Sequence, residues 1–253
     1  MNPLSIIGAG PGAPDLLTLR AVNRLQQAQV LVWADSLVSP AIAALTPRKC
    51  ERIPTSCLSL VEIMPLLVNR VEQGLRVVRL HDGDPCLYSA ISEQVCLLAD
   101  AGIPVEVIPG LSAYQATAAR LGAELTIPGF VQTIVLGRIK GCTEIRESER
   151  LDKLAALGAS LCLYLSARHV EKVQAILLQH YTSDTPVAIG YRVSWPDEWL
   201  RVVPLRDIAE VSRQHQLVRT TLYIISPALA GTTSAQHSCV YDPDHNHLFR
   251  PRR

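Results

Sequence analysis

The sequence predicts an α/β protein with two domains. Short apolar runs of strand length alternate with segments whose apolar residues recur at helical spacing, which is the pattern of a sheet covered by helices. The chain has 253 residues, 48% of them hydrophobic, enough for two packed α/β domains. Glycine–proline turns directly follow two of the expected strands, at residues 8–12 and 82–85.

The first domain is expected to span residues 1–118 and to contain a parallel sheet. Its expected strands are 4–7, 30–33, 77–80 and 105–108. The run at 30–33 is apolar throughout, as in a strand that is buried on both faces of a parallel sheet. The expected helices cover 59–73, 89–100, 113–121 and a stretch that Pro14-Asp15 opens and that continues to Leu25.

A second α/β pattern is expected over residues 119–231, followed by a polar tail at 232–253 that contains three histidines. Its expected strands are 133–136, 160–165, 187–191, 200–203 and 221–225. Its expected helices lie near 151–157, 168–180 and 205–214.

Composition excludes several classes of function. Lys+Arg is 24 and Asp+Glu is 23, so the net charge of +1 gives no general attraction to nucleic acid or to an anionic membrane. Neither a signal peptide nor a membrane-spanning run is visible, and the cysteine usage leads us to expect a reducing cytoplasm. The seven cysteines are odd in number and lack a C-x-x-C pattern, which favours neither disulfides nor a zinc ribbon. No metal site is expected.

The two glycine–proline turns are the main candidate site. Gly8-Ala9-Gly10-Pro11-Gly12 follows one strand, and Asp82-Gly83-Asp84-Pro85 follows another. Glycine lets the main chain approach a ligand closely, and proline makes the turn stiff before anything binds. Two such turns at one sheet edge predict a shared rim for a small molecule. The alternative is that both are only strand-to-helix turns.

The first turn also suggests a dinucleotide site, but it fits poorly. The fingerprint is G-x-G-x-x-G, and here the third glycine comes one residue early. Pro11 lacks the N–H that a phosphate cradle would use. Asp35 follows the second strand where a ribose-binding acid would lie, so an NAD-dependent oxidoreductase stays open as an alternative.

Two further turn residues have alternative roles. Asp84 could cap the helix that follows it or accept hydrogen bonds from a ribose. Pro109-Gly110-Leu111-Ser112-Ala113 follows a third strand, and Ser112 is expected to cap the next helix.

At these turns the chain resembles the tetrapyrrole methyltransferases, which methylate uroporphyrinogen and the precorrins with S-adenosylmethionine. The motifs are G-A-G-P-G-x-x-x-L-L-T at 8–18, G-D-P at 83–85 and P-G-L-S-A at 109–113. Other stretches are similar to one branch, the precorrin-4 C11-methyltransferases of cobalamin synthesis. They are A-D-S-L-V at 34–38, E-L-T-I-P at 124–128, Q-T at 132–133, D-T-P-V-A at 184–188, Y-R-V-S-W-P-D-E at 191–198 and Y-D-P-D-H at 241–245.

The resemblance implies two α/β domains with the active site in the cleft between them, and a homodimer. It also implies which residues bind the donor. Those from the first domain are Pro11, Asp82, Gly83, Asp84, Leu87, Ser112 and Ala113, and those from the second are Leu165 and Val193. The chain departs from the family pattern at Asp82, Cys86, Ser89 and Gly137, which concerns fine specificity more than the class of reaction.

Methyl transfer from a sulfonium needs alignment of the donor methyl and the acceptor carbon more than any redox centre. The implied acceptor is a flat macrocycle with many carboxylates, with or without cobalt, which calls for dispersed cations. Arg138, Arg192 and Lys140 are the preferred candidates, because the two arginines follow apolar strands. The other candidates are Arg20, Arg120 and Arg168.

A carbon nucleophile can also need a base, and Asp35, His81 and Asp82 are the candidates. Besides the oxidoreductase, two alternatives stay open: methylation of another tetrapyrrole carbon or another acceptor, and a non-enzymatic tetrapyrrole- or RNA-binding protein. The aromatic content of 5% disfavours an RNA-stacking surface.

Overall fold

The computed structural model describes residues 3–141, 143–231 and 246, and the chain divides into two compact units. Unit 1 runs up to Ala116 and also includes the loop Arg192–Glu198. Unit 2 contains Thr117–Tyr191 and the chain from Trp199 onward. The 192–198 loop therefore groups with the first unit, whereas the sequence had placed it in the second domain.

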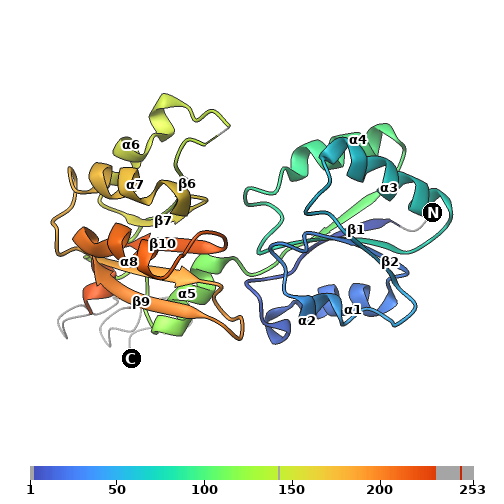
Figure 1. Cartoon of the computed structure of the whole chain (residues 1–253), viewed down its shortest axis with the longest axis horizontal. Helices are drawn as coiled ribbons and strands as arrows, with labels where there is room; N and C mark the ends of the chain where they lie inside the picture. The colour runs from blue at the N-terminus through green and yellow to red at the C-terminus, as the bar shows by residue number, and fades with distance from the viewer. Residues whose placement is uncertain (1–2, 142, 232–245, 247–253) are drawn as a thin grey trace. The chain divides into compact units, whose positions relative to one another are not determined.

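Unit 1 contains a five-stranded sheet with the order β3-β2-β4-β1-β5 (Figure 1). All of its pairings are parallel, as expected. The sequence missed β3, because its residues Glu51 and Arg52 are polar and exposed at the sheet edge. The strands are β1 (Leu4–Gly8), β2 (Val30–Trp33), β3 (Glu51–Pro54), β4 (Val77–His81) and β5 (Val105–Ile108).

Helices cover both faces of this sheet. Figure 1 shows α1 (Leu19–Gln27) and α2 (Pro40–Ala43) on one face, and α3 (Leu60–Glu72) and α4 (Ile91–Asp100) on the other. The alternation along β1 matches: Ile7 packs with the α1 and α2 residues, while Leu4 and Ile6 pack with those of α3. Burial on both faces explains the continuous apolar runs of the central strands.

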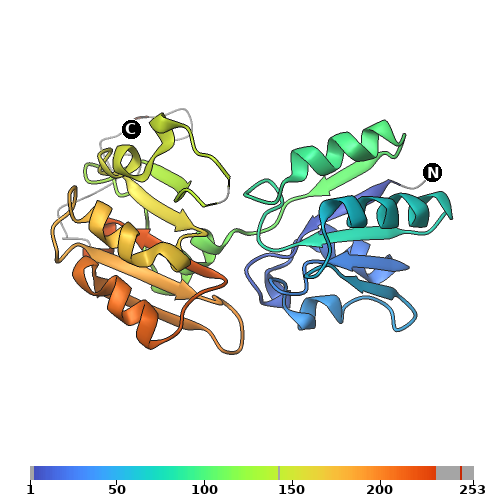
Figure 2. The same ribbon diagram turned by 45° about the horizontal axis from the view of Figure 1, so that its top comes forward.

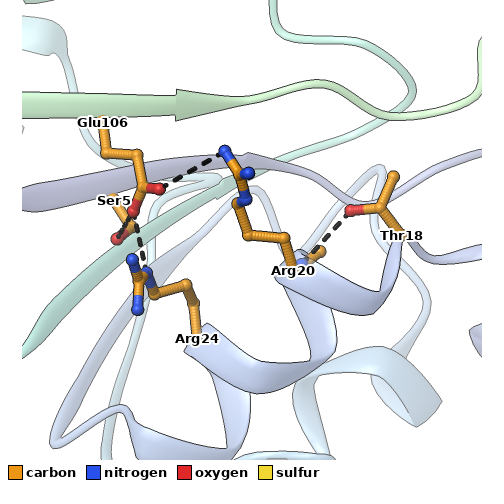
Figure 3. A network of polar contacts seen from close by, with 6 residues as sticks. Ser5, Thr18, Arg20, Arg24 and Glu106 are labelled. Carbon is orange, nitrogen blue, oxygen red and sulfur yellow. Dashed lines mark hydrogen bonds and ion pairs between the residues drawn. The ribbon is translucent and has the colours of Figure 1, made fainter.

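The first helix begins later than expected. A short 3-10 turn, η1 (Pro14–Leu16), comes first, and α1 then begins at Leu19 after the cap Thr18, whose Oγ1 accepts from the N–H of Ala21 at 3.2 Å. Figure 3 shows how α1 is fixed to β5. Glu106 accepts from Arg24 Nε at 2.8 Å and lies 3.8 Å from Arg20 Nη1. The N-terminal helical pattern therefore corresponds to two separate elements.

Unit 2 contains a mixed sheet with the order β6-β7-β10-β8-β9, in which β6 and β7 are parallel and the other pairings antiparallel. Its core lies on the face covered by three helices, and Figure 2 shows α7 and α8 beside each other on that face. The strands are β6 (Ile134–Arg138), β7 (Ser160–Tyr164), β8 (Pro186–Tyr191), β9 (Trp199–Pro204) and β10 (Thr221–Ile225). The helices are α6 (Leu151–Ala155), α7 (Val170–Leu177) and α8 (Ile208–Gln214), with the 3-10 turns η2 (Glu147–Glu149), η3 (Ala167–His169), η4 (Leu205–Asp207) and η5 (Pro227–Ala230).

The expected strands and helices of the second pattern are thus confirmed, with shifts of a few residues at their ends. Helix α5 (Ala113–Leu121) links the two patterns along the chain. The tail expected at 232–253 lies outside the described residues except for Asn246. Within the described part of the chain, no helix combines the length and the hydrophobicity needed to cross a bilayer.

Candidate active site at the carboxyl edge of the first sheet

Three loops meet at the carboxyl edge of the unit 1 sheet. They follow β1, β4 and β5, and β1 lies between the other two strands. The N–H of Gly10 donates to the carbonyl of Gly83 at 3.1 Å, and the N–H of Gly83 donates to the carbonyl of Gly10 at 2.9 Å. The expectation that the two glycine–proline turns share one rim is therefore confirmed.

Glycine is required at this rim because the loops pack backbone against backbone. A Cβ on Gly8 would lie 2.6 Å from both the nitrogen of Gly110 and the carbonyl oxygen of Gly83. A Cβ on Gly110 would lie 2.2 Å from that same oxygen. The rim consequently presents peptide groups with few side chains, which is a surface that a flat or polar small molecule can approach closely.

The strand order places this rim at a switch point. The helix after β1 (α1) lies on one face of the sheet, and the helix after β4 (α4) lies on the other. Open α/β sheets bind ligands beyond the carboxyl ends of their strands at such points. The topology and the bare backbone therefore indicate the same position.

The loop after β4 has an unusual conformation. Gly83, Tyr88 and Ala90 have φ of 55°, 60° and 50°. Asp84 does not cap the next helix as one interpretation of the sequence had it, because α4 begins only at Ile91. Its Oδ1 instead accepts from the N–H of Cys86 at 2.8 Å and so shapes the turn.

A buried cation lies beneath this loop. Arg79 of β4 is 6% exposed, and its Nη1 donates to Thr55 Oγ1 at 3.2 Å. Its Nε lies 3.5 Å from Gln94 Oε1, and Gln94 Nε2 donates to the carbonyl of Ser89 at 3.0 Å. Burial lowers the pKa of Arg79 to about 10, so the group stays charged at neutral pH. No prediction was made for this residue, although an arginine inside the apolar run 77–80 is a sequence signal for a buried charge.

The three candidate bases differ in environment. Burial, together with the charge of Arg79, lowers the pKa of His81 to about 3, and its Nε2 has no hydrogen-bond partner among the described residues. Burial raises the pKa of Asp82, while Arg79 opposes that rise. A carboxylate with a raised pKa is a stronger base, whereas a histidine at about 3 is a weak one.

Asp35 is held by hydrogen bonds to the chain that follows β3. Its carboxylate accepts hydrogen bonds from Thr55 N at 2.9 Å, Ser56 N at 2.8 Å and Ser56 Oγ at 2.7 Å. Desolvation acts to raise its pKa, but these hydrogen bonds hold the pKa below its ordinary value. Strand β4 lies between β2 and β1, so Asp35 does not follow a strand adjacent to the first glycine turn. This order argues against the NAD-dependent alternative, which needs those strands to be neighbours.

The 192–198 loop also reaches the rim. Trp195 Nε1 donates to the carbonyl of Pro11 at 2.9 Å, and Ser194 Oγ accepts from the N–H of Ala13 at 2.9 Å. Val193 is buried in unit 1, although the resemblance had assigned it to the second domain. The other expected pocket residue of that domain, Leu165, is 68% exposed directly after β7 in unit 2.

The remaining expected residues have local partners. Ser112 is buried, and its N–H donates to Gln115 Oε1 at 2.8 Å, just before α5. Arg138 donates to the carbonyl of Glu144 at 3.2 Å, and Lys140 pairs with Glu144 at 2.7 Å. Arg192 pairs with Asp197. In the described part of the chain no three His, Cys, Asp or Glu side chains converge as a metal site would require.

Comparison with known proteins identifies the family. The family described as Tetrapyrrole (Corrin/Porphyrin) Methylases matches residues 3–209 of the chain. The protein belongs to the tetrapyrrole methylases. A curated relative of this family from Pseudomonas aeruginosa, named precorrin-4 C(11)-methyltransferase, is 40% identical over 97% of both chains. Another, from Priestia megaterium and named cobalt-precorrin-4 C(11)-methyltransferase, is 37% identical over 98% of this chain and 97% of its own.

Solved structures agree with this assignment to the tetrapyrrole methylases. A cobalt precorrin-4 methyltransferase superposes with a TM-score of 0.86 at 38% identity, covering 89% of this chain and 95% of its own. A uroporphyrin-III C-methyltransferase from Thermus thermophilus, solved in complex with S-adenosylhomocysteine, gives a TM-score of 0.76 at 26% identity, covering 90% and 99%. The α/β fold with two sheets is therefore that of the family.

Proposed function

We propose that the protein is an S-adenosylmethionine-dependent methyltransferase that methylates carbon 11 of precorrin-4 or cobalt-precorrin-4. The observation that carries this proposal is the rim of bare backbone at Gly8, Gly83 and Gly110, in a chain whose near full-length relatives carry these two enzyme names. Both names occur at 37–40% identity, so identity does not choose between the metal-free and the cobalt-containing acceptor.

The rim fits a sulfonium nucleoside. Its peptide groups at Gly10 and Gly83 lie side by side with no Cβ between them, and Pro11 offers no N–H for a phosphate. Pro11, Asp82, Gly83, Asp84 and Leu87 would bind the donor in unit 1, together with Ser112, Ala113 and Val193. Leu165 would contribute from unit 2. When bound, the donor supplies an electrophilic methyl group.

The chain's own residues would then bind, orient and accept a proton. The stiff turns hold their shape before binding, which lowers the entropic cost of alignment. Of the three candidate bases, we favour Asp82, because burial raises the pKa of its carboxyl and so makes its carboxylate oxygen more basic. Asp35 is occupied by three hydrogen bonds, and His81 is buried with a pKa of about 3.

We also propose that the acceptor's carboxylates meet Arg138, Lys140 and other exposed cations, whose present partners lie at the surface and can be exchanged. A homodimer is proposed from the family resemblance. The cytoplasm is the proposed compartment. Free thiols at Cys57, Cys86 and Cys96, all exposed, are consistent with a reducing environment.

Isothermal titration with S-adenosylhomocysteine tests the donor, with NADH as the comparison ligand. Binding of the first and not of the second is expected. No binding of S-adenosylhomocysteine at millimolar concentration would overturn the proposal. Mass spectrometry and NMR of the products from precorrin-4 and cobalt-precorrin-4 then locate the new methyl group. A methyl on another ring carbon would refute the assignment to carbon 11 while leaving the methyltransferase class intact.

A further inference from the structure

The 192–198 loop is held in shape by its own side chains. The guanidinium of Arg192 lies 4.0 Å from the centre of the Trp195 ring and is paired with Asp197. The N–H of Ser194 donates to Glu198 Oε2 at 2.6 Å. Arg192 and Ser194 have φ of 47° and 69°, a conformation that non-glycine residues adopt only when their surroundings impose it. These contacts within the loop hold the Trp195 indole in one position.

This ordered indole lies against the first glycine turn. Besides the hydrogen bond from Trp195 Nε1 to the carbonyl of Pro11, at 2.9 Å, the ring fills the space beside Gly12. A Cβ on Gly12 would lie 2.1 Å from Trp195 Cδ1. In addition, the N–H of Ala13 donates a hydrogen bond to Ser194 Oγ at 2.9 Å. Two polar bonds and one close packing contact thus fix three consecutive residues of the turn.

We propose that Trp195 is a positioning residue for donor binding, which sets the shape of the Pro11–Ala13 turn before the donor arrives. This inference rests on the proposed function. Pro11 has no N–H and so cannot be tied down by its own amide, and its carbonyl is the group that Trp195 holds. A turn that is ordered in advance costs the ligand less entropy on binding.

The same geometry gives Arg192 a different role from the acceptor clamp that the sequence predicted. Its guanidinium covers the face of the indole and is paired with Asp197, so its planar surface is already in use. We therefore assign Arg192 to the support of Trp195. Replacing it should affect donor binding through the turn, with no direct effect on the recognition of acceptor carboxylates.

The test compares Trp195→Phe with Trp199→Phe. The first variant keeps an aromatic ring but removes the N–H donor. The second is the control, and it changes a tryptophan at the start of β9 whose ring centre lies 4.7 Å from that of His215. Two quantities are measured: the Kd for S-adenosylhomocysteine by calorimetry, and hydrogen exchange of the Ala13 amide without ligand. Loss of one typical hydrogen bond predicts a Kd about 3- to 10-fold higher and a similarly faster exchange for Trp195→Phe. Trp199→Phe should match the wild type.

Equal Kd and equal exchange in Trp195→Phe and the wild type would overturn the proposal. If Trp195→Phe does not fold, hydrogen exchange of the Trp195 indole N–H in the wild-type protein is measured in its place. This N–H should exchange about tenfold or more slowly than that of a free indole, and an unprotected N–H refutes the proposal. Arg192→Met should also raise the Kd for S-adenosylhomocysteine. The exchange measurements need no ligand, so they distinguish failure of this inference from a wild-type protein that fails to bind S-adenosylhomocysteine at all.

Discussion

Replacing Gly8 with alanine would place a methyl group where two neighbouring loops already lie. The added Cβ would be 2.6 Å from two backbone atoms, Gly110 N and Gly83 O, about 0.8 Å short of the 3.4 Å at which ordinary contact begins. Neither atom can rotate away as a side chain would. Overpacking of this kind typically costs about 1–3 kcal/mol of folding free energy, which corresponds to a fall in Tm of about 2–4 °C per kcal/mol for 150–250 residues.

The distances from an added Cβ to its neighbours also predict how strongly different glycine-to-alanine variants are destabilised. Gly110→Ala should destabilise more than Gly8→Ala, because its Cβ would lie only 2.2 Å from Gly83 O. Gly141→Ala is the matched control, since a Cβ there meets no atom within 4 Å. Thermal unfolding followed by circular dichroism and calorimetric titration of S-adenosylhomocysteine measure both effects. A Gly8→Ala protein that unfolds within 1 °C of the Gly141→Ala control and binds with unchanged Kd would refute the close-packed rim.

Three further predictions follow from individual charges. Asp35→Ala should lower the free energy of unfolding by about 1–2 kcal/mol at pH 7, and because the folded-state pKa of Asp35 is depressed, the difference from wild type should shrink as pH falls below about 4 in urea titrations. The His81 imidazole should stay neutral from pH 8 to pH 5, so its NMR signals should not titrate in that range. Because its folded-state pKa of about 3 lies below the unfolded value, its contribution to the free energy of unfolding should decline as pH falls from about 6.5 toward 3. Glu106→Gln should cost at most about 1 kcal/mol, and 1 M NaCl should reduce that cost, because its arginine partners are well exposed; an unchanged cost in salt would contradict a screened ion pair.

Periodicity located most of the fold because the central strands are buried on both faces and so are apolar throughout. It failed where that condition fails. Strand β3 is a polar edge strand, and α2 is a short helix of four residues, Pro40–Ala43, too short for a helical period to show. The continuous pattern from Pro14 to Leu25 was wrong because Leu17 and Thr18 are extended and the Thr18 cap restarts the helix.

Within the site, the sequence located the turns but not what holds them. Glycine and proline favour turns through their own backbone geometry, so the turns at residues 8–12 and 82–85 could be recognised from the sequence alone. The contact between Trp195 and Pro11 joins residues 184 positions apart, and no local pattern encodes that distance. The hydrogen bonds of Asp35 were not foreseen for the same reason, because its partners Thr55 and Ser56 directly follow β3, a strand that the sequence did not reveal.

Three titratable groups lie on or directly after β4 and influence one another's charge: Arg79, His81 and Asp82. Arg79 stays cationic beneath the loop, and its charge acts on two neighbours in opposite ways: it helps keep His81 neutral and opposes the rise in the pKa of Asp82. Removing Arg79 should therefore make Asp82 harder to ionise and His81 easier to protonate. A buried cation is costly, and Arg79 lies two residues before His81 on the same strand, where its charge acts on both titratable neighbours.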